Sequence, residues 1–93
     1  MSEPATLLLG LGRAIREARA ELRISQEELG LRTGVHRNYI GGIERGERNP
    51  SVVTVAKLAQ ALELSPSELF RDAERRREQQ ARSYFDEHGR WPD

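Results

Sequence analysis

The chain of 93 residues has no cysteine, few aromatic residues and no apolar run close to the roughly 20 residues that span a bilayer. Without cysteine it forms no disulfide, no thiolate zinc site and no cysteine nucleophile. Its two histidines, His36 and His88, lie far apart and neither has metal-ligand spacing around it, so we expect no metal site and no cofactor. The first residues do not resemble a secretory signal, because they contain no basic stretch ahead of an apolar segment. We therefore expect a cytoplasmic protein with no membrane partner.

The sequence also lacks an excess of charge, because its 15 basic residues balance its 15 acidic ones. A small nucleic-acid-binding domain often carries a visible basic excess, so the total charge argues mildly against such a partner. The local distribution is different, since residues 30–50 contain four arginines and only two glutamates. Arginine suits bidentate contacts with phosphate and guanine, although a GC-rich genome favours the same residue.

The apolar residues recur at helical spacing and no stretch alternates as a strand does, which predicts an all-α fold of five helices. The first helix is expected to begin at an N-cap on Thr6, after a flexible arm of residues 1–5, and to continue to about residue 22. Ser25 and Ser65 each start a capping box with the glutamate three residues further on. The helix that Ser51 caps is expected to face the core with Val52, Val55, Leu58, Ala59 and Leu62.

Residues 26–45 have the pattern of two short helices joined by a tight turn. Gly30 provides the small residue that two crossing helices need where their backbones approach. Gly34 provides the positive φ that the turn needs. Val35, Ile40 and Ile43 are expected to anchor the second helix while its opposite face stays free. Each feature is weak evidence alone, but together they predict a helix-turn-helix.

Residues 11–70 resemble the phage-repressor and Cro-type helix-turn-helix regulators, the XRE family. The segments that carry the resemblance are Ser25-Gln-Glu-Glu-Leu29, Gly34-Val35, Tyr39-Ile40, Ile43-Glu-Arg-Gly46, Arg48-Asn-Pro-Ser51 and Leu64-Ser-Pro-Ser-Glu-Leu-Phe70. The run from Arg37 to Gly46 is similar to the controller proteins of restriction–modification systems. The resemblance implies a repressor-like domain over residues 6–70 that binds double-stranded DNA as a homodimer.

The resemblance also implies roles for single residues. Arg37 and Asn38 would contact bases from the first turn of the reading helix, since arginine suits guanine and asparagine suits adenine. His36 is expected to cap that helix, with a base contact as its second role. An ion pair of Arg19 with Glu44 would tie the first helix to the end of the reading helix. The phosphate contacts would come from Gln26, Tyr39, Arg45, Arg48, Asn49 and Ser51.

Plainer interpretations of these residues stay open. Arg37 and Arg48 are also ordinary solvated charges, and Gln26 is also a good first-turn residue. The ring of Tyr39 is as well suited to packing beside the core as its hydroxyl is to a phosphate. The pair Gly41-Gly42 costs the reading helix about 1 kcal/mol per glycine and removes side chains that could read inner base pairs. We therefore expect readout to depend on few residues and partly on DNA shape.

Residues 71–93 form a charged extension, which is expected to continue the fifth helix to His88 before Gly89 ends it. The extension is predicted to dock against the protein's own body or a second subunit. The expected dimer-interface residues are Leu69, Tyr84, Phe85 and Trp91.

The sequence thus predicts a sequence-specific transcriptional regulator that acts as a homodimer on a two-fold-symmetric operator, with a restriction–modification controller as the named subtype. The alternative is an antitoxin-type regulator whose C-terminal tail engages a partner protein. An enzyme is not expected, because the sequence has no nucleophile–base pair, phosphate-binding loop or metal-ligand set.

Overall fold

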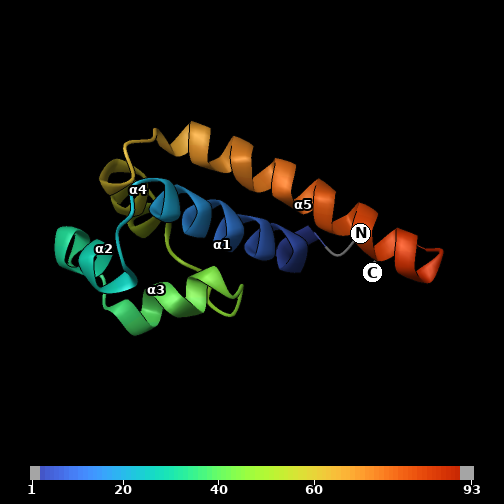
Figure 1. Cartoon of the computed structure of the whole chain (residues 1–93), viewed down its shortest axis with the longest axis horizontal. Helices are drawn as coiled ribbons and strands as arrows, with labels where there is room; N and C mark the ends of the chain where they lie inside the picture. Colours follow the sequence, from blue (N-terminus) through green and yellow to red (C-terminus); the bar gives the residue numbers. More distant parts are fainter. Residues whose placement is uncertain (1–2, 91–93) are drawn as a thin grey trace.

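The computed structural model describes residues 3–90, except for the side chains of residues 3–5, 80 and 81. This part of the chain forms helices and no strand, as predicted (Figure 1). The five helices are α1 (Glu3–Glu21), α2 (Gln26–Thr33), α3 (Arg37–Glu44), α4 (Val52–Ala61) and α5 (Pro66–His88). None of the helices within residues 3–90 combines the length and the apolar character needed to cross a membrane.

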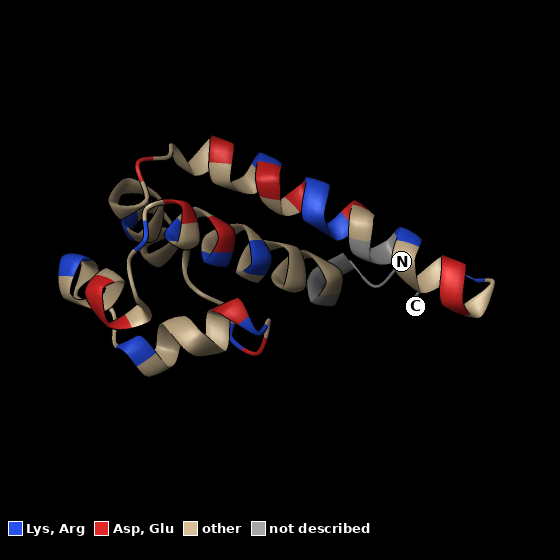
Figure 2. Ribbon diagram, viewed as in Figure 1, with Lys and Arg blue, Asp and Glu red and all other residues tan. Residues whose placement is uncertain are grey.

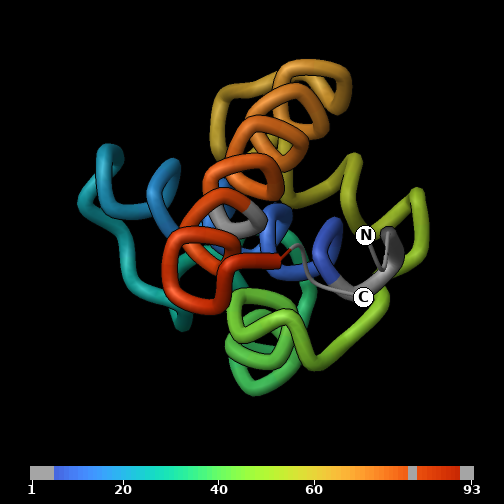
Figure 3. Tube along the Cα trace, turned by 90° about the vertical axis from the view of Figure 1, so that its right-hand side faces the viewer, coloured from blue at the N-terminus to red at the C-terminus, as the bar shows by residue number. Residues whose placement is uncertain are grey.

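The two long helices α1 and α5 lie side by side and run in opposite directions, and they give the molecule its longest dimension of 42 Å (Figures 1 and 3). The short helix α3 lies on the side of α1 that faces away from α5. An ion pair between Glu17 of α1 and Arg76 of α5 supports the long contact. The shape leaves α3 at one edge of the molecule, where its outer face is open.

The core collects apolar side chains from all five helices. Its largest fully buried side chains are Ile15, Leu29, Ile40, Ile43, Leu58 and Leu69. Burying a side chain of this size stabilises a fold by about 1.5–3 kcal/mol. Because Ile40 and Ile43 both belong to α3, the core fixes which face of that helix points outward.

Two glycines allow α1 to pack closely on both of its neighbours. A Cβ on Gly10 would overlap the carbonyl oxygen of Ala73 in α5. A Cβ on Gly12 would lie 2.5 Å from the carbonyl oxygen of Ile43 in α3 and would overlap that of Glu44. Neither close approach was predicted from the sequence.

Local signals set most helix ends as predicted. Ser65 and Glu68 form the predicted capping box, in which each backbone N–H donates to the other residue's side chain. The hydrogen bond that the Ser65 backbone N–H donates to the Glu68 carboxylate lowers the pKa of this carboxyl below its ordinary value. Gly89 ends α5 with a φ of 70°, as expected.

The expected start of the first helix is wrong. Helix α1 already begins at Glu3, so residues 3–5 are helical. Thr6 lies inside the helix with 8% of its surface exposed and does not act as an N-cap. Helical periodicity alone did not locate this end, because it indicates the buried face of a helix and not its first residue.

The structure also corrects two predictions about apolar residues. Val55, Leu58, Ala59 and Leu62 are buried as expected, but Val52 is 77% exposed because the first turn of α4 lies at the surface. Leu69 is fully buried in the core of its own chain, so it cannot supply a dimer interface. Helix α5 continues past residue 70 as expected, and Ala73 in that continuation is fully buried.

We predict that Gly12→Ala lowers the free energy of unfolding by about 1–3 kcal/mol, the usual cost of overpacking. The added methyl group meets backbone atoms of α3, which cannot move separately from the helix. Gly41→Ala is the matched control, because its Cβ would meet only flexible side-chain ends, with Arg45 Nη1 nearest at 3.1 Å. The control should be neutral or gain up to about 1 kcal/mol from helix propensity. Urea unfolding measures both, and equal stability of the two variants would contradict the prediction.

Candidate nucleic-acid interface

Helices α2 and α3 form the predicted pair, joined by a tight turn. Ser25 caps α2 by accepting a hydrogen bond from the Glu28 backbone N–H over 3.0 Å. Gly34 ends α2 with φ 77° and ψ 7° and donates its N–H to the Gly30 carbonyl oxygen. A Cβ on Gly30 would lie 2.6 Å from the Val35 carbonyl oxygen, so this position needs glycine. Both glycines therefore have the roles predicted for them, a close backbone approach at Gly30 and a positive φ at Gly34.

The core holds one face of α3 and leaves the other open. Ile40 and Ile43 are buried, and Val35 packs against the core just before the helix. Arg37 and Asn38, in the first turn, are exposed. The helix therefore presents an arginine and an asparagine to a ligand that approaches its outer face.

The carboxylate of Glu44 joins three helices at the base of α3. Arg19 of α1 donates from Nε to Glu44 Oε2 over 2.8 Å and from Nη2 to Oε1 over 3.0 Å, so the predicted ion pair is present. Arg19 Nη1 also donates to the Ile24 carbonyl oxygen. Donating these hydrogen bonds to the Glu44 carboxylate raises the pKa of the Arg19 guanidinium above its ordinary value. The Glu44 side chain is only 4% exposed, which makes this network an internal one.

Gln26 takes part in the same network, which the sequence did not indicate. Its Nε2 donates to Glu44 Oε1 over 3.0 Å. The side chain of Gln26 is thereby held over α3, where a Cβ on Gly41 would lie 3.4 Å from its Oε1. The first residue of α2 is thus coupled to the last residue of α3.

His36 caps α3, as expected. Its Nδ1 accepts a hydrogen bond from the Asn38 backbone N–H over 3.0 Å. An imidazole that accepts at Nδ1 is neutral and carries its proton on Nε2. The exposed side chain is therefore left with an N–H donor, which suits a phosphate oxygen or a base acceptor.

Gly41 and Gly42 give the middle of α3 no side chains, but side chains from outside the helix cover this stretch. A Cβ on Gly42 would lie 2.6 Å from Arg48 Cγ, so the glycine makes room for the arginine. The Arg48 guanidinium lies 6.0 Å from the centroid of the Tyr39 ring, and Tyr39 packs against the core. Cationic and polar groups therefore reach the middle of the helix from outside it.

Two arginines on this surface form ion pairs with glutamates. Arg37 Nη1 donates to Glu27 Oε2 over 2.8 Å, and Arg45 Nε donates to Glu47 Oε2 over 3.0 Å. Figure 2 shows the resulting alternation of basic and acidic residues along α2, α3 and the loop after it. Neither ion pair was predicted from the sequence.

The remaining predicted site residues lie in two places. Asn49 and Ser51 are exposed in the loop after α3, where Ser51 Oγ accepts from the Thr54 N–H and caps α4. Tyr84 and Phe85 lie far from α3, near the end of α5. Trp91 lies outside the described residues.

Comparison with known proteins gives a consistent result. Residues 15–69 match the family HTH_3, described as helix-turn-helix. The control protein C.BamHI of Bacillus amyloliquefaciens is 39% identical over 60 residues, which cover 63% of this chain and 74% of that protein. The crystal structure of the restriction-modification controller protein C.AhdI from Aeromonas hydrophila matches with 47% identity and a TM-score of 0.65, over 67% of this chain and 94% of that one. The controller protein C.Esp1396I, solved as a tetramer with its natural 35 base-pair operator, matches with 30% identity and a TM-score of 0.69, over 76% and 93% of the two chains.

We predict that Glu44→Ala lowers the free energy of unfolding by roughly 3 kcal/mol, because it leaves the partly buried Arg19 charge without its partner. Glu47→Ala is the control, since it removes an ion pair whose two side chains are 60% and 61% exposed. An exposed pair contributes about 1 kcal/mol or less. Thermal and urea unfolding of both variants test the difference. Similar small losses for both would show that the Glu44 network does not stabilise the fold.

Proposed function

This chain belongs to the helix-turn-helix family HTH_3, and from that premise we propose that it is a sequence-specific DNA-binding transcriptional regulator that acts as a homodimer on a two-fold-symmetric operator. The observation that carries the proposal is the open first turn of α3, with Arg37 and Asn38 exposed at the edge of the molecule. Its relatives are transcriptional regulators and controller proteins, which favours this function over an antitoxin-type protein that binds another protein through its tail.

The proposed reader of bases is the N-terminal turn of α3, placed in the major groove. The eight residues of α3 span about 12 Å, which suits a few adjacent base pairs. Arg37 is assigned to guanine O6 and N7, and Asn38 to adenine N6 and N7. The Nε2–H of His36 adds a donor at the same end. The two glycines that follow leave the inner base pairs to indirect readout of DNA shape.

The proposed phosphate contacts surround the reading helix. Gln26 stands at the N-terminus of α2, where the helix dipole and free N–H groups favour an anion. The side chains of Arg45 and Arg48 lie over Gly41 and Gly42, so they are placed beside the groove that α3 would enter. Tyr39, Asn49 and Ser51 complete the assigned set. Contacts of this kind set the position of the protein on the duplex but do not read its sequence.

The named subtype is a controller protein of a restriction–modification system that regulates its own expression. Support comes from the relatives C.BamHI and C.AhdI, and C.Esp1396I is an operator-bound tetramer. For this chain we infer operator binding by at least a dimer. We propose no enzymatic activity for this protein. We place it in the cytoplasm, together with its DNA target.

We propose that the end of α5 supplies the dimer interface. The Tyr84 ring stacks on His88 with centroids 3.9 Å apart, and Arg90 lies 5.6 Å from the centroid of the same ring. Phe85, which follows Tyr84 in the chain, is 38% exposed. An aromatic cluster on a projecting helix end is suited to an isologous contact with its copy.

The two-fold operator is tested by a footprint on the DNA upstream of the protein's own gene. Two protected half-sites are expected, with centres about 10–10.5 base pairs apart or a multiple of that spacing. This spacing follows because both reading helices of a symmetric dimer must enter the groove on one face of the duplex. One isolated asymmetric region of protection would contradict the proposal.

The assigned roles of Arg37 and Gln26 predict different kinds of loss. Arg37→Ala should cost about 1–3 kcal/mol on the cognate duplex and relax the preference at one base position per half-site. Gln26→Ala should weaken cognate and scrambled duplexes alike, because phosphates carry no sequence information. Titrations with both duplexes measure this. If Arg37→Ala weakens both duplexes equally, Arg37 is not a base reader.

The tail assignment predicts that a chain ending at Arg82 stays folded but loses the dimer. Folding should persist because Ala73 is the last residue of the buried core. Phe85→Asp in the full chain should have the same effect, whereas Glu87→Ala, exposed in the same turn, should not. Sedimentation over a range of concentrations measures the oligomeric state. A shortened chain that still dimerises would place the interface elsewhere, for example at the exposed Val52 and Val53.

A further inference from the structure

The surface that would face DNA carries only a small excess of positive charge, because Glu44 alone among its glutamates is withdrawn into the internal network with Arg19. Residues 26–51 contain four arginines and four glutamates. Every one of these glutamates forms an ion pair with an arginine in the structure. The pairs are Glu27–Arg37 at 2.8 Å, Glu28–Arg32 at 3.9 Å, Glu44–Arg19 at 2.8 Å and Glu47–Arg45 at 3.0 Å. Non-specific attraction to phosphate is weak on such a surface, because that attraction grows with the number of uncompensated cations.

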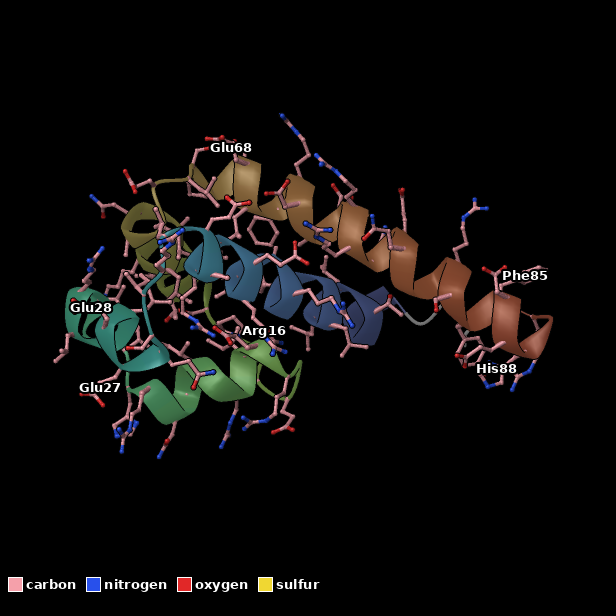
Figure 4. The ribbon with its side chains drawn as sticks, in the orientation of Figure 1. Arg16, Glu27, Glu28, Glu68, Phe85 and His88 are labelled. Carbon is pink, nitrogen blue, oxygen red and sulfur yellow. The ribbon has the colours of Figure 1, made fainter. Side chains whose placement is uncertain are left out.

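The pair of Glu27 with Arg37 differs from the others because it links α2 directly to the base-reading turn of α3. Both side chains are well exposed, at 62% and 60%. Figure 4 shows Glu27 at the outer edge of the molecule, beside the start of α3. The acid is therefore placed where DNA would approach, and not on a remote face.

The geometry of the contact leaves the guanine-binding edge of Arg37 open. Glu27 Oε2 binds Nη1 of the guanidinium, and no contact of Nε or Nη2 is found within residues 3–90. A guanidinium has five N–H donors in a planar fork, so one edge can bind a carboxylate while the other binds an acceptor pair. Guanine O6 and N7 form such a pair in the major groove.

We propose that Glu27 is a positioning residue that stays bound to Arg37 in the operator complex and raises discrimination between cognate and other DNA. This inference rests on the proposed function. The carboxylate orients the free edge of Arg37 toward the bases, which favours guanine. It also neutralises the charge of Arg37, which weakens the attraction between this side chain and a DNA phosphate. Specificity is a difference between two affinities, and the pair widens it by favouring the cognate duplex and weakening binding to other DNA.

The test uses Glu27→Gln in the full chain, with the duplex that the protein selects from random-sequence DNA and a scrambled duplex of equal length. Removing the charge should raise affinity for the scrambled duplex about two- to five-fold, the range of an exposed ion pair. Affinity for the selected duplex should not rise, so the ratio of the two affinities falls. The slope of log affinity against log salt on scrambled DNA should steepen by about 0.9 for each subunit, as Arg37 becomes free to neutralise a phosphate.

Glu74→Gln is the matched control, because it makes the same change in net charge on exposed α5 and should leave the ratio unchanged. Glu27→Gln combined with Arg37→Ala gives the second arm. In that background the Glu27 substitution should have no further effect, since its partner is absent. Unchanged melting temperatures show that folding is preserved, as expected for a side chain 62% exposed.

Three results would overturn the inference: an unchanged affinity ratio in Glu27→Gln, an equal change in Glu74→Gln, or a full effect that persists without Arg37. The last would show simple repulsion between Glu27 and DNA. If the wild-type protein selects no duplex at all, the proposed function itself fails. If it selects one and Glu27→Gln keeps the full ratio, only the role of Glu27 fails.

Discussion

The carboxylate of Glu44 holds together the three helices on which the reading surface depends. It is nearly inaccessible to solvent, so its charge has to be compensated within the chain. Arg19 supplies two hydrogen bonds from α1, and Gln26 supplies one from α2. Because Glu44 is the last residue of α3, these bonds fix the base of the reading helix relative to both neighbours. Arg37 and Asn38 can therefore remain exposed on a turn of α3 that still has a defined position.

Close backbone contacts support this network in a chain that has little core to spare. Gly12 brings α1 against the carbonyl groups at the end of α3, next to Glu44. Gly10 brings the same helix against α5. Small domains bury a modest fraction of their surface, so tight approach between elements matters more than in larger proteins. These two glycines in the middle of α1 thus contribute to the positions of two helices that are distant in sequence.

The zero net charge of the chain is compatible with its proposed function, because the positions of the charges matter more than their sum. The glutamates between residues 26 and 51 are all paired with arginines. None of these ion pairs involves the side chain of Asn38 or of His36. Such a surface depends less on general attraction to phosphate and more on the match between donors and bases. Composition alone therefore gives a poor measure of whether a domain of this kind binds DNA.

The sequence by itself determined the helices, most of their ends and the helix-turn-helix. Serine caps, the capping box at Ser65 and the glycine at Gly34 act within about four residues, so local pattern is enough to identify them. The resemblance to a family added the pair of Arg19 with Glu44. Only the tertiary structure decided the exposure of Val52, the burial of Leu69 and the pair of Glu27 with Arg37. These features depend on contacts between helices that are far apart in the sequence. Periodicity shows where apolar and charged side chains lie along a helix, but it does not show which residues they contact.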